Sequence, residues 1–266
     1  MKPKALILQA RGTNRDIDVA EALTLAGAEP IFTPLNDLRT KKTSWEKFQM
    51  LVVPGGFSYA DALGAGKLLA LDLNSYFADE IAAFVASGKP VIGICNGFQA
   101  LVKSGILPGN GTHPKDKTQK HSLSATLTFN ERGRFECRWV TLQAVSQISI
   151  WTKNLNKLVT CPIAHGEGNF QTSHDSFTST LVSHDQIALT YVNTDGSPSK
   201  GEYPVNPNGS VLDIAGISNP AGNVLGLMPH PENHIRSWQH PRHTRGESGQ
   251  SGLTLFENGV HYATQI

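Results

Sequence analysis

One cysteine lies in a pattern that can present a nucleophile. Cys95 stands between Gly93 and Gly97, which is the spacing of a nucleophile elbow, where small residues two positions to either side allow a strained turn. The apolar run 91–94 predicts a strand before the cysteine, and helix-compatible residues resume at Phe98. A thiol at the tip of such a turn can attack a carbonyl carbon. The same residues also fit a buried core cysteine before an Asn-Gly hairpin, so partners elsewhere must decide between the two.

A histidine and a glutamate late in the chain are suited to serve such a cysteine. Prolines flank His230 in Pro229-His230-Pro231-Glu232, which excludes helix and favours extended backbone, where residues two apart point the same way. An imidazole can take the proton of a thiol, and a carboxylate behind it fixes the imidazole tautomer. The sequence therefore predicts a general base, His230, and its orienting group, Glu232. The alternative is a surface loop in which both residues are incidental.

Two glycines follow another strand of the buried type. Pro54-Gly55-Gly56-Phe57 comes directly after an apolar run that ends at Val53. Doubly wound folds place their sites at the carboxyl edge of the sheet, where this segment and Cys95 are expected to meet. Peptide N–H groups at the glycines can turn inward as an oxyanion hole. An ordinary turn is the competing interpretation.

Composition narrows the classes of function. The chain has 266 residues with 23 basic and 22 acidic side chains, and the formal net charge of +1 gives no indication of a nucleic-acid or membrane partner. Three cysteines without a Cys-x-x-Cys spacing argue against a disulfide framework and a cysteine zinc site. The histidines between His230 and His243 lack a zinc-binding spacing, and Gly64 to Lys67 lacks the full phosphate-loop pattern. We therefore predict no metal and no cofactor in this chain.

The order of the predicted elements indicates an α/β fold. Strand patterns alternate with helical patterns in the first half, which predicts a flavodoxin-like, mostly parallel sheet with helices on both faces. The second half is rich in strand patterns and predicts a smaller antiparallel extension. The strand patterns are at 5–8, 29–32, 48–53, 91–94, 157–163, 187–192, 211–217 and 224–228, and the helical patterns are at 15–25, 61–71, 75–86 and 253–262.

Three further expectations concern the chain as a whole. Residues 123–129 and 135–139 alternate on either side of a turn-like stretch, which predicts two antiparallel strands joined by a turn. Residues 240–252 are rich in Gly, Ser and charge, which predicts a flexible segment within a single domain over 1–266. No apolar run approaches the roughly 20 residues that a membrane span needs, so we expect a cytoplasmic protein.

Three separated motifs together resemble the class I, triad-type glutamine amidotransferases. They are Pro54-Gly55-Gly56, Gly93-x-Cys95-x-Gly97-x-Gln99 and His230-Pro231-Glu232. Within that family the chain is most similar to the branch that forms the glutaminase component of phosphoribosylformylglycinamidine synthases, which act in purine biosynthesis. The similarity extends from the first strand to about residue 236, and the further motifs that carry it are Gly55-Gly56-Phe57-Ser58-Tyr59-Ala60-Asp61, Arg134-Phe135-Glu136-Cys137-Arg138-Trp139, Ala164-His165-Gly166-Glu167-Gly168 and Tyr203-Pro204-Val205-Asn206-Pro207-Asn208-Gly209-Ser210.

The resemblance implies a reaction and assigns residues to it. Cys95 would attack the side-chain amide of glutamine, giving a γ-glutamyl thioester and ammonia, and water would then release glutamate. His230 would be the base and acid, and Glu232 its orienting group. Backbone N–H groups would form the oxyanion hole at Gly55, Gly56 and Asn96. The substrate-binding residues implied by the resemblance are Phe57, Gln99, His165, Gly166 and Glu167.

The resemblance also implies partners. Ammonia would pass to a separate synthetase subunit of phosphoribosylformylglycinamidine synthase, which uses ATP and Mg, and a small accessory subunit is compatible with the same assembly. Asn233 stands where the family commonly has Arg, and Ala60 where many single-chain members have Gly; both departures bear on partner contacts. Two rival interpretations remain: a cysteine hydrolase or redox sensor built on the same elbow, and a non-enzymatic scaffold subunit.

Overall fold

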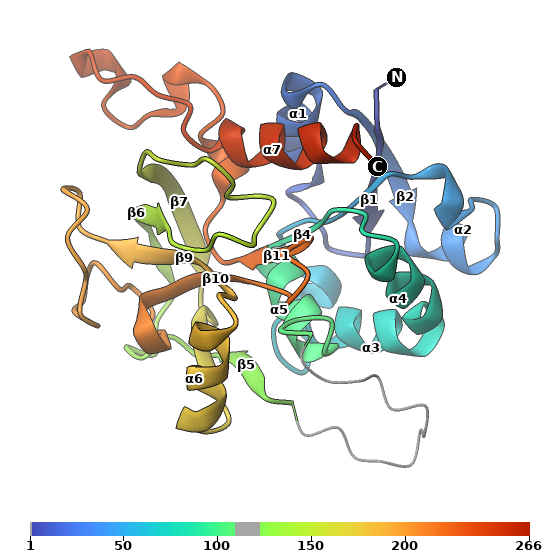
Figure 1. Cartoon of the computed structure of the whole chain (residues 1–266), viewed down its shortest axis with the longest axis horizontal. Coiled ribbons are helices and arrows are strands. Elements are labelled where there is room, and N and C mark those ends of the chain that lie inside the picture. The colour runs from blue at the N-terminus through green and yellow to red at the C-terminus, as the bar shows by residue number, and fades with distance from the viewer. Residues whose placement is uncertain (1, 110–122) are drawn as a thin grey trace.

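A nine-stranded mixed sheet runs through the molecule (Figure 1). The computed structural model describes residues 2–109 and 123–266. Five neighbouring strands are parallel, in the order β2-β1-β3-β4-β11, and this half of the sheet is the predicted flavodoxin-like core. Its strands are β1 (Lys4–Gln9), β2 (Glu29–Pro34), β3 (Met50–Val53), β4 (Val91–Ile94) and β11 (Val224–Leu227).

The second half of the chain extends this sheet with antiparallel strands. The order continues from β11 through β10, β9 and β6 to β7, and each of these neighbours is antiparallel to the next. A separate two-stranded sheet pairs β5 with β8. The predicted antiparallel extension is confirmed, with β5 (Ala125–Thr128), β6 (Glu136–Ala144), β7 (Val159–His165), β8 (Asn169–Thr172), β9 (Ile187–Val192) and β10 (Ile214–Ser218).

Helices cover both faces of the parallel half. Figure 1 shows α1 and α7 together on one side of the strands and α3, α4 and α5 on the other. Because both faces are covered, all residues of β3, β4 and β11 are buried, which explains their nearly uniform apolar sequences. The helices are α1 (Asp16–Ala26), α2 (Leu35–Arg39), α3 (Lys67–Tyr76), α4 (Ala78–Ala86), α5 (Asn96–Lys103), α6 (Asp175–Ser183) and α7 (Leu253–Ala263).

The predicted hairpin between 123–129 and 135–139 is wrong. β5 pairs with β8, whereas β6 pairs with β7 and β9. The stretch between β5 and β6 is held by Asn130, whose amide donates to the carbonyls of Arg134 and His165 at 2.9 and 2.8 Å. The turn is thereby fixed to the end of β7, so its two arms diverge into different sheets.

The helix expected over 61–71 begins later, at Lys67. Four of the five residues from 59 to 63 have φ between 52° and 65°: Tyr59, Ala60, Asp61 and Leu63. Residues with side chains adopt this left-handed region at a cost, and a right-handed helix cannot pass through it. The loop is instead tied to α5 by a network around Asn96, described below.

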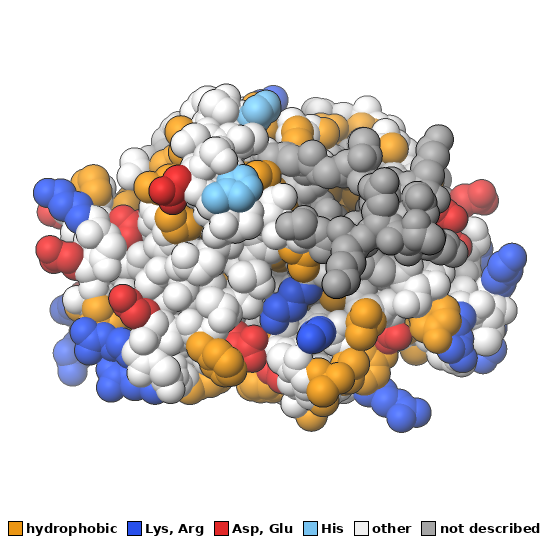
Figure 2. Space-filling view, turned by 90° about the horizontal axis from the view of Figure 1, so that it is seen from below, with side chains coloured by type: hydrophobic (Ala, Val, Ile, Leu, Met, Phe, Trp, Pro, Cys, Tyr) orange, Lys and Arg blue, Asp and Glu red, His pale blue; other side chains and the backbone are white. Residues whose placement is uncertain are grey.

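Residues 240–252 are described in full and contain one short 3-10 turn, His243–Arg245. Their flexibility stays a prediction. On the face shown in Figure 2, basic and acidic side chains are both spread over the surface, as the near-zero net charge suggests. Within the described parts of the chain, no helix has both the length and the apolar character needed to cross a bilayer.

Candidate active site

Cys95 occupies the tip of a strained turn between β4 and α5. Its φ and ψ are 49° and −105°, outside the regions that residues with side chains normally adopt. Two close approaches allow the turn: a Cβ on Gly97 would lie 1.9 Å from the carbonyl oxygen of Val53, and one on Gly93 would lie 2.5 Å from Leu101. The strand, turn and helix predicted around the cysteine are therefore present, and the strain holds the thiol at the carboxyl edge of the sheet.

His230 and Glu232 form a buried pair at the same edge. His230 Nδ1 lies 2.6 Å from Glu232 Oε1, and the two residues are 3% and 0% exposed. The backbone is not extended as predicted, because Pro231–Asn233 forms a 3-10 turn. Proline is compatible with the first position of a helical turn, and the turn itself brings the carboxylate back to the imidazole.

The position of His230 is fixed from two sides. Its backbone N–H donates to the carbonyl of Pro162 in β7 at 2.8 Å. On the other side it faces Gly55, where an added Cβ would lie 2.9 Å from the imidazole Cε1 and 3.5 Å from the Cβ of Cys95. Gly55 therefore leaves the space in which the thiol and the imidazole approach each other.

The surroundings of His230 favour its charged form. Burial lowers the pKa of the imidazole, but the charges of Glu232 and Cys95 and hydrogen bonds to them outweigh burial and raise that pKa to about 10. A histidine that holds its proton beside a thiol favours an imidazolium–thiolate pair. His230 can then also donate its proton to a leaving group.

A cavity of about 310 Å³ opens at Cys95. Four residues of the predicted site line it: Cys95, His230, Gly56 and half-exposed Phe57. Three further lining residues were missed by sequence reasoning: Asn14, Arg15 and Ala164. Asn14 and Arg15 follow β1, so the rule that places sites after the carboxyl ends of parallel strands could have found them.

Backbone N–H groups are available on both sides of the cysteine. Gly56 has φ of 125°, and a Cβ there would lie 2.6 Å from the backbone nitrogen of Asn14. Within the described parts of the chain, neither Gly56 N–H nor Asn96 N–H donates to an acceptor. Cys95 N–H, in contrast, donates to the carbonyl of Leu227 at 2.8 Å and is not available.

The side chain of Asn96 organises the loop that follows the two glycines. Its Oδ1 accepts from the backbone N–H and the hydroxyl of Ser58 at 3.1 and 2.5 Å. Its Nδ2 donates to Asp61 at 2.8 Å and to Gln99 Oε1 at 3.1 Å. These bonds anchor the left-handed segment to the start of α5, which explains how its backbone strain is sustained.

Gln99 and Glu167 belong to this network and do not line the cavity at Cys95. Gln99 Nε2 donates to the carbonyl of Glu167 at 2.6 Å. The carboxylate of Glu167 accepts from Ala65 N–H at 3.2 Å and pairs with Lys103 at 3.3 Å. Gly166 and His165 are not among the described residues that line that cavity either. The structure thus brings the motifs together, and the glutamine contacts of these four residues stay a prediction.

His165 is a buried neutral imidazole with a defined tautomer. Asn130 Nδ2 donates to two carbonyls, so its Oδ1 is the acceptor; it accepts from Gly168 N–H at 2.9 Å and lies 3.2 Å from His165 Nδ1. His165 Nδ1 must therefore carry the proton, which leaves Nε2 as an acceptor. Nε2 is buried and has no partner among the described residues. Burial, followed by the charge of His230, lowers the pKa of His165 to about 3.

Comparison with known proteins agrees with this geometry. Residues 2–263 match the model of the CobB/CobQ-like glutamine amidotransferase domain. The chain belongs to this family. The family predicted from the motifs is therefore confirmed, and with it the assignment of the chain to glutamine amidotransferases.

Relatives of known name match this amidotransferase along their whole length. The chain is 54% identical to phosphoribosylformylglycinamidine synthase subunit PurQ of Treponema denticola, over 98% of this chain and 99% of that protein. It is 42% identical to the subunit of the same name from Dehalococcoides mccartyi, over 100% of this chain and 99% of that protein. A chain in the structure of PurLQS from Thermotoga maritima superposes with a TM-score of 0.73 at 30% identity, covering 98% of this chain and 99% of that one.

Proposed function

We propose that this amidotransferase is the glutaminase subunit of phosphoribosylformylglycinamidine synthase in purine biosynthesis. It hydrolyses glutamine to glutamate and ammonia and passes the ammonia to a synthetase subunit. The observation that carries the proposal is the strained Cys95 beside the buried His230–Glu232 pair, in a chain matched end to end by subunits of that name. A cysteine redox sensor does not require a buried carboxylate such as Glu232 hydrogen-bonded to the imidazole.

Catalysis begins with the imidazolium–thiolate pair. The thiolate of Cys95 attacks the side-chain amide carbon of glutamine, forming a C–S bond while the C=O electron pair moves to oxygen. The N–H groups of Gly56 and Asn96 stabilise the resulting oxyanion, and Gly55 keeps the adjoining space open. His230 then gives its proton to the amide nitrogen, the C–N bond breaks, and ammonia leaves.

The second half of the reaction reverses the roles. Neutral His230 takes a proton from water, and the hydroxide adds to the thioester carbon. The C–S bond breaks, glutamate is released and the thiolate of Cys95 is regenerated. Glu232 does not exchange protons; it holds Nδ1–H of His230 so that Nε2 faces the reacting atoms, and it stabilises the imidazolium.

The remaining motif residues bind the substrate in this proposal. His165 Nε2 is a buried acceptor without a described partner, so it suits an N–H group, either of the glutamine amide or of the ammonia formed from it. A histidine with a pKa near 3 is neutral and cannot protonate that ammonia, so the ammonia stays nucleophilic. Phe57 lines the cavity and can contact the substrate directly. Gln99 and Glu167, which do not line it, would act through the hydrogen bond from Gln99 Nε2 to the carbonyl of Glu167, and the role of Gly166 rests on its motif.

The ammonia acceptor and its energy source belong to partners. The synthetase subunit uses the ATP and Mg. A small accessory subunit completes the assembly, and the three subunit letters in the name of the PurLQS complex support this third component. Among the described residues, no group of three His, Cys, Asp or Glu side chains is arranged to hold a metal ion. We place this assembly in the cytoplasm, where free thiols persist.

The test uses the chain together with its synthetase. Glutamate release should be abolished in Cys95→Ala, whereas the same complex should still make product from added ammonia. Unchanged glutamine turnover in that variant contradicts the assignment of Cys95. Covalent labelling of Cys95 by a glutamine-mimicking electrophile, blocked by excess glutamine, separates a glutaminase from another cysteine hydrolase.

A further inference from the structure

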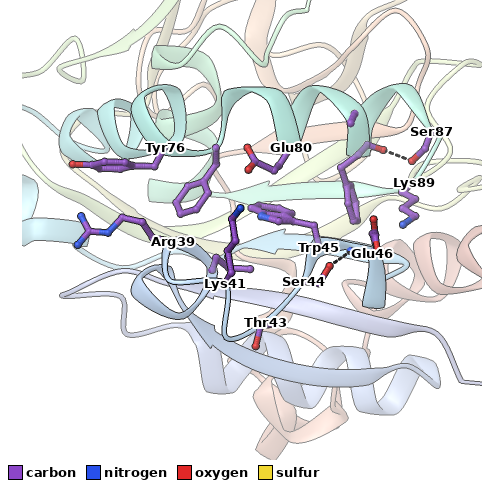
Figure 3. Close-up of a pocket in the computed structure, with 14 residues that line it drawn as sticks. Arg39, Lys41, Thr43, Ser44, Trp45, Glu46, Tyr76, Glu80, Ser87 and Lys89 are labelled. Carbon is purple, nitrogen blue, oxygen red and sulfur yellow. Dashed lines mark hydrogen bonds between the residues drawn. The ribbon is translucent and has the colours of Figure 1, made fainter.

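A second cavity lies away from the cysteine. It encloses about 630 Å³ between the segment from α2 to the 3-10 turn Trp45–Lys47 on one side and helices α3 and α4 on the other (Figure 3). No described residue lines both this cavity and the one at Cys95. Small-molecule sites commonly occupy about 300–1,000 Å³, so the cavity has room for an organic ligand.

Aromatic side chains form its apolar wall. The ring centroid of Trp45 lies 5.8 Å from that of Phe77 and 6.2 Å from that of Phe84. Phe77 and Phe84 are buried, whereas Trp45 is partly exposed and extends across the middle of the cavity (Figure 3). The face of a large aromatic ring stacks on other planar π systems. This wall therefore favours a flat ligand over a branched aliphatic one.

Cationic side chains stand at the rim. Arg39 lies 5.1 Å from the ring centroid of Tyr76 at one end, and Lys89 lies 4.9 Å from that of Phe84 at the other (Figure 3). Lys41 projects between them, and no acidic residue in the described parts of the chain pairs with any of the three. Unpaired cations on both sides of an aromatic wall suit an anionic ligand.

The end of the cavity at Arg39 continues into a second hollow of about 320 Å³. This hollow shares Arg39, Tyr76 and Phe77 with the cavity and adds the guanidinium of Arg11. Its one carboxylate, Asp72, already accepts the hydroxyl of Tyr59. Guanidinium groups match phosphate oxygens with two parallel hydrogen bonds, so this end is the place for a phosphate.

We propose that this cavity binds a nucleoside 5′-monophosphate. The base stacks on Trp45, and the phosphate lies at Arg39 and Arg11. Glu46 and Glu80, which also line the cavity, accept hydrogen bonds from base N–H or ribose O–H groups and weaken the binding of a bare anion. The site has no glycine-rich phosphate loop and lies outside the proposed glutaminase chemistry, so either proposal can fail without the other.

Calorimetric titration of the full chain, without glutamine or partner, tests the proposal. AMP is the probe, and adenosine, ribose 5-phosphate and inorganic phosphate are the comparison ligands. AMP should bind saturably, one molecule per chain, and more tightly than each comparison ligand, because only AMP engages both the aromatic wall and the arginines. Cys95→Ala should bind AMP as the natural chain does.

Two variants locate the binding. Arg39→Gln and Trp45→Leu should each weaken AMP binding about tenfold or more, the loss expected for one charge-assisted hydrogen bond or one stacked base. The matched control is Lys42→Gln, an exposed neighbour that pairs with Asp37 outside the cavity and should leave affinity unchanged. Melting temperatures verify that each variant folds. If Trp45→Leu does not fold, the AMP affinity of Arg39→Gln tests the proposal, because Arg39 is exposed. Absence of saturable AMP binding, equal affinity for phosphate or adenosine, or unchanged affinity in Arg39→Gln overturns the proposal.

Discussion

Gly55 leaves open the space that the imidazole of His230 occupies. A methyl group at this glycine would lie 2.9 Å from Cε1 of the ring, closer than non-bonded carbon atoms approach. The thiol and the imidazole come from distant parts of the chain, and the absence of a side chain here lets them meet. The two glycines after β3 therefore do more than turn the backbone.

Gly55→Ala should reduce glutaminase activity by displacing the imidazole. A misplacement of about 1 Å can cost on the order of a hundredfold in rate, and we expect a loss of that order in kcat. Steady-state kinetics of glutamate release measure it. Ammonia-dependent synthesis by the same complex is the control and should be unaffected, and a variant with unchanged kcat for glutamine would contradict this role of Gly55.

Glu232→Gln should lower the alkaline limit of glutaminase activity. The pKa of His230 is raised to about 10 against burial, and Glu232 is the charge that contributes most to raising it. Without that charge the imidazole loses its proton at lower pH, and kcat should also fall by about a thousandfold or more because the tautomer is no longer held. The pH profile of kcat measures both. An alkaline limb that stays in place would show that Glu232 does not set this pKa.

The same pair makes stability depend on pH. Because the folded-state pKa of His230 lies above the ordinary value of 6.5, its contribution to the free energy of unfolding is full below pH 6.5 and is lost as pH rises toward 10. Urea denaturation at several pH values should show this decline in the natural chain. It should be reduced in His230→Gln, and equal slopes in the two proteins would contradict the raised pKa.

His165 should stay neutral throughout the physiological range. Burial lowers its pKa to about 3, and Asn130 fixes the proton on Nδ1. Nitrogen-15 NMR of histidine-labelled protein should show one ring unchanged in the Nδ1–H form from neutral pH down to the onset of acid unfolding. His165→Phe should remove that signal and impair glutamine turnover. Titration of every ring near pH 6.5 would refute the assignment.

Ser58→Ala should loosen the loop that follows the glycines. The variant removes the 2.5 Å hydrogen bond to Asn96, a buried acceptor, and should cost about 1 kcal/mol of unfolding free energy. Ser183→Ala is the control, since the Ser183 hydroxyl is exposed and bonds only groups near the end of its own helix, the carbonyl of Thr180 and the ring of His184. Urea midpoints compare the two, and an equal effect of both substitutions would show that the network around Asn96 does not stabilise the loop.

The sequence alone determined the features that depend on neighbouring residues. The elbow around Cys95 follows from glycines at fixed spacing, because small residues two positions to either side permit the strained turn. The parallel core follows from short apolar runs alternating with helical patterns, since both faces of such strands are covered. The motifs of the catalytic pair and of the glycine turn could be recognised because each consists of a few consecutive residues.

Tertiary structure decided what depends on residues far apart. Asn130 attaches its turn to β7 rather than closing a hairpin, and no local pattern indicates that its side chain also bonds the distant carbonyl of His165. Left-handed backbone at Tyr59 to Leu63 is sustained by Asn96, so local propensity alone predicted a helix there. The pKa values of His165 and His230 differ for the same reason: burial acts on both rings, and only packing places a carboxylate beside one of them.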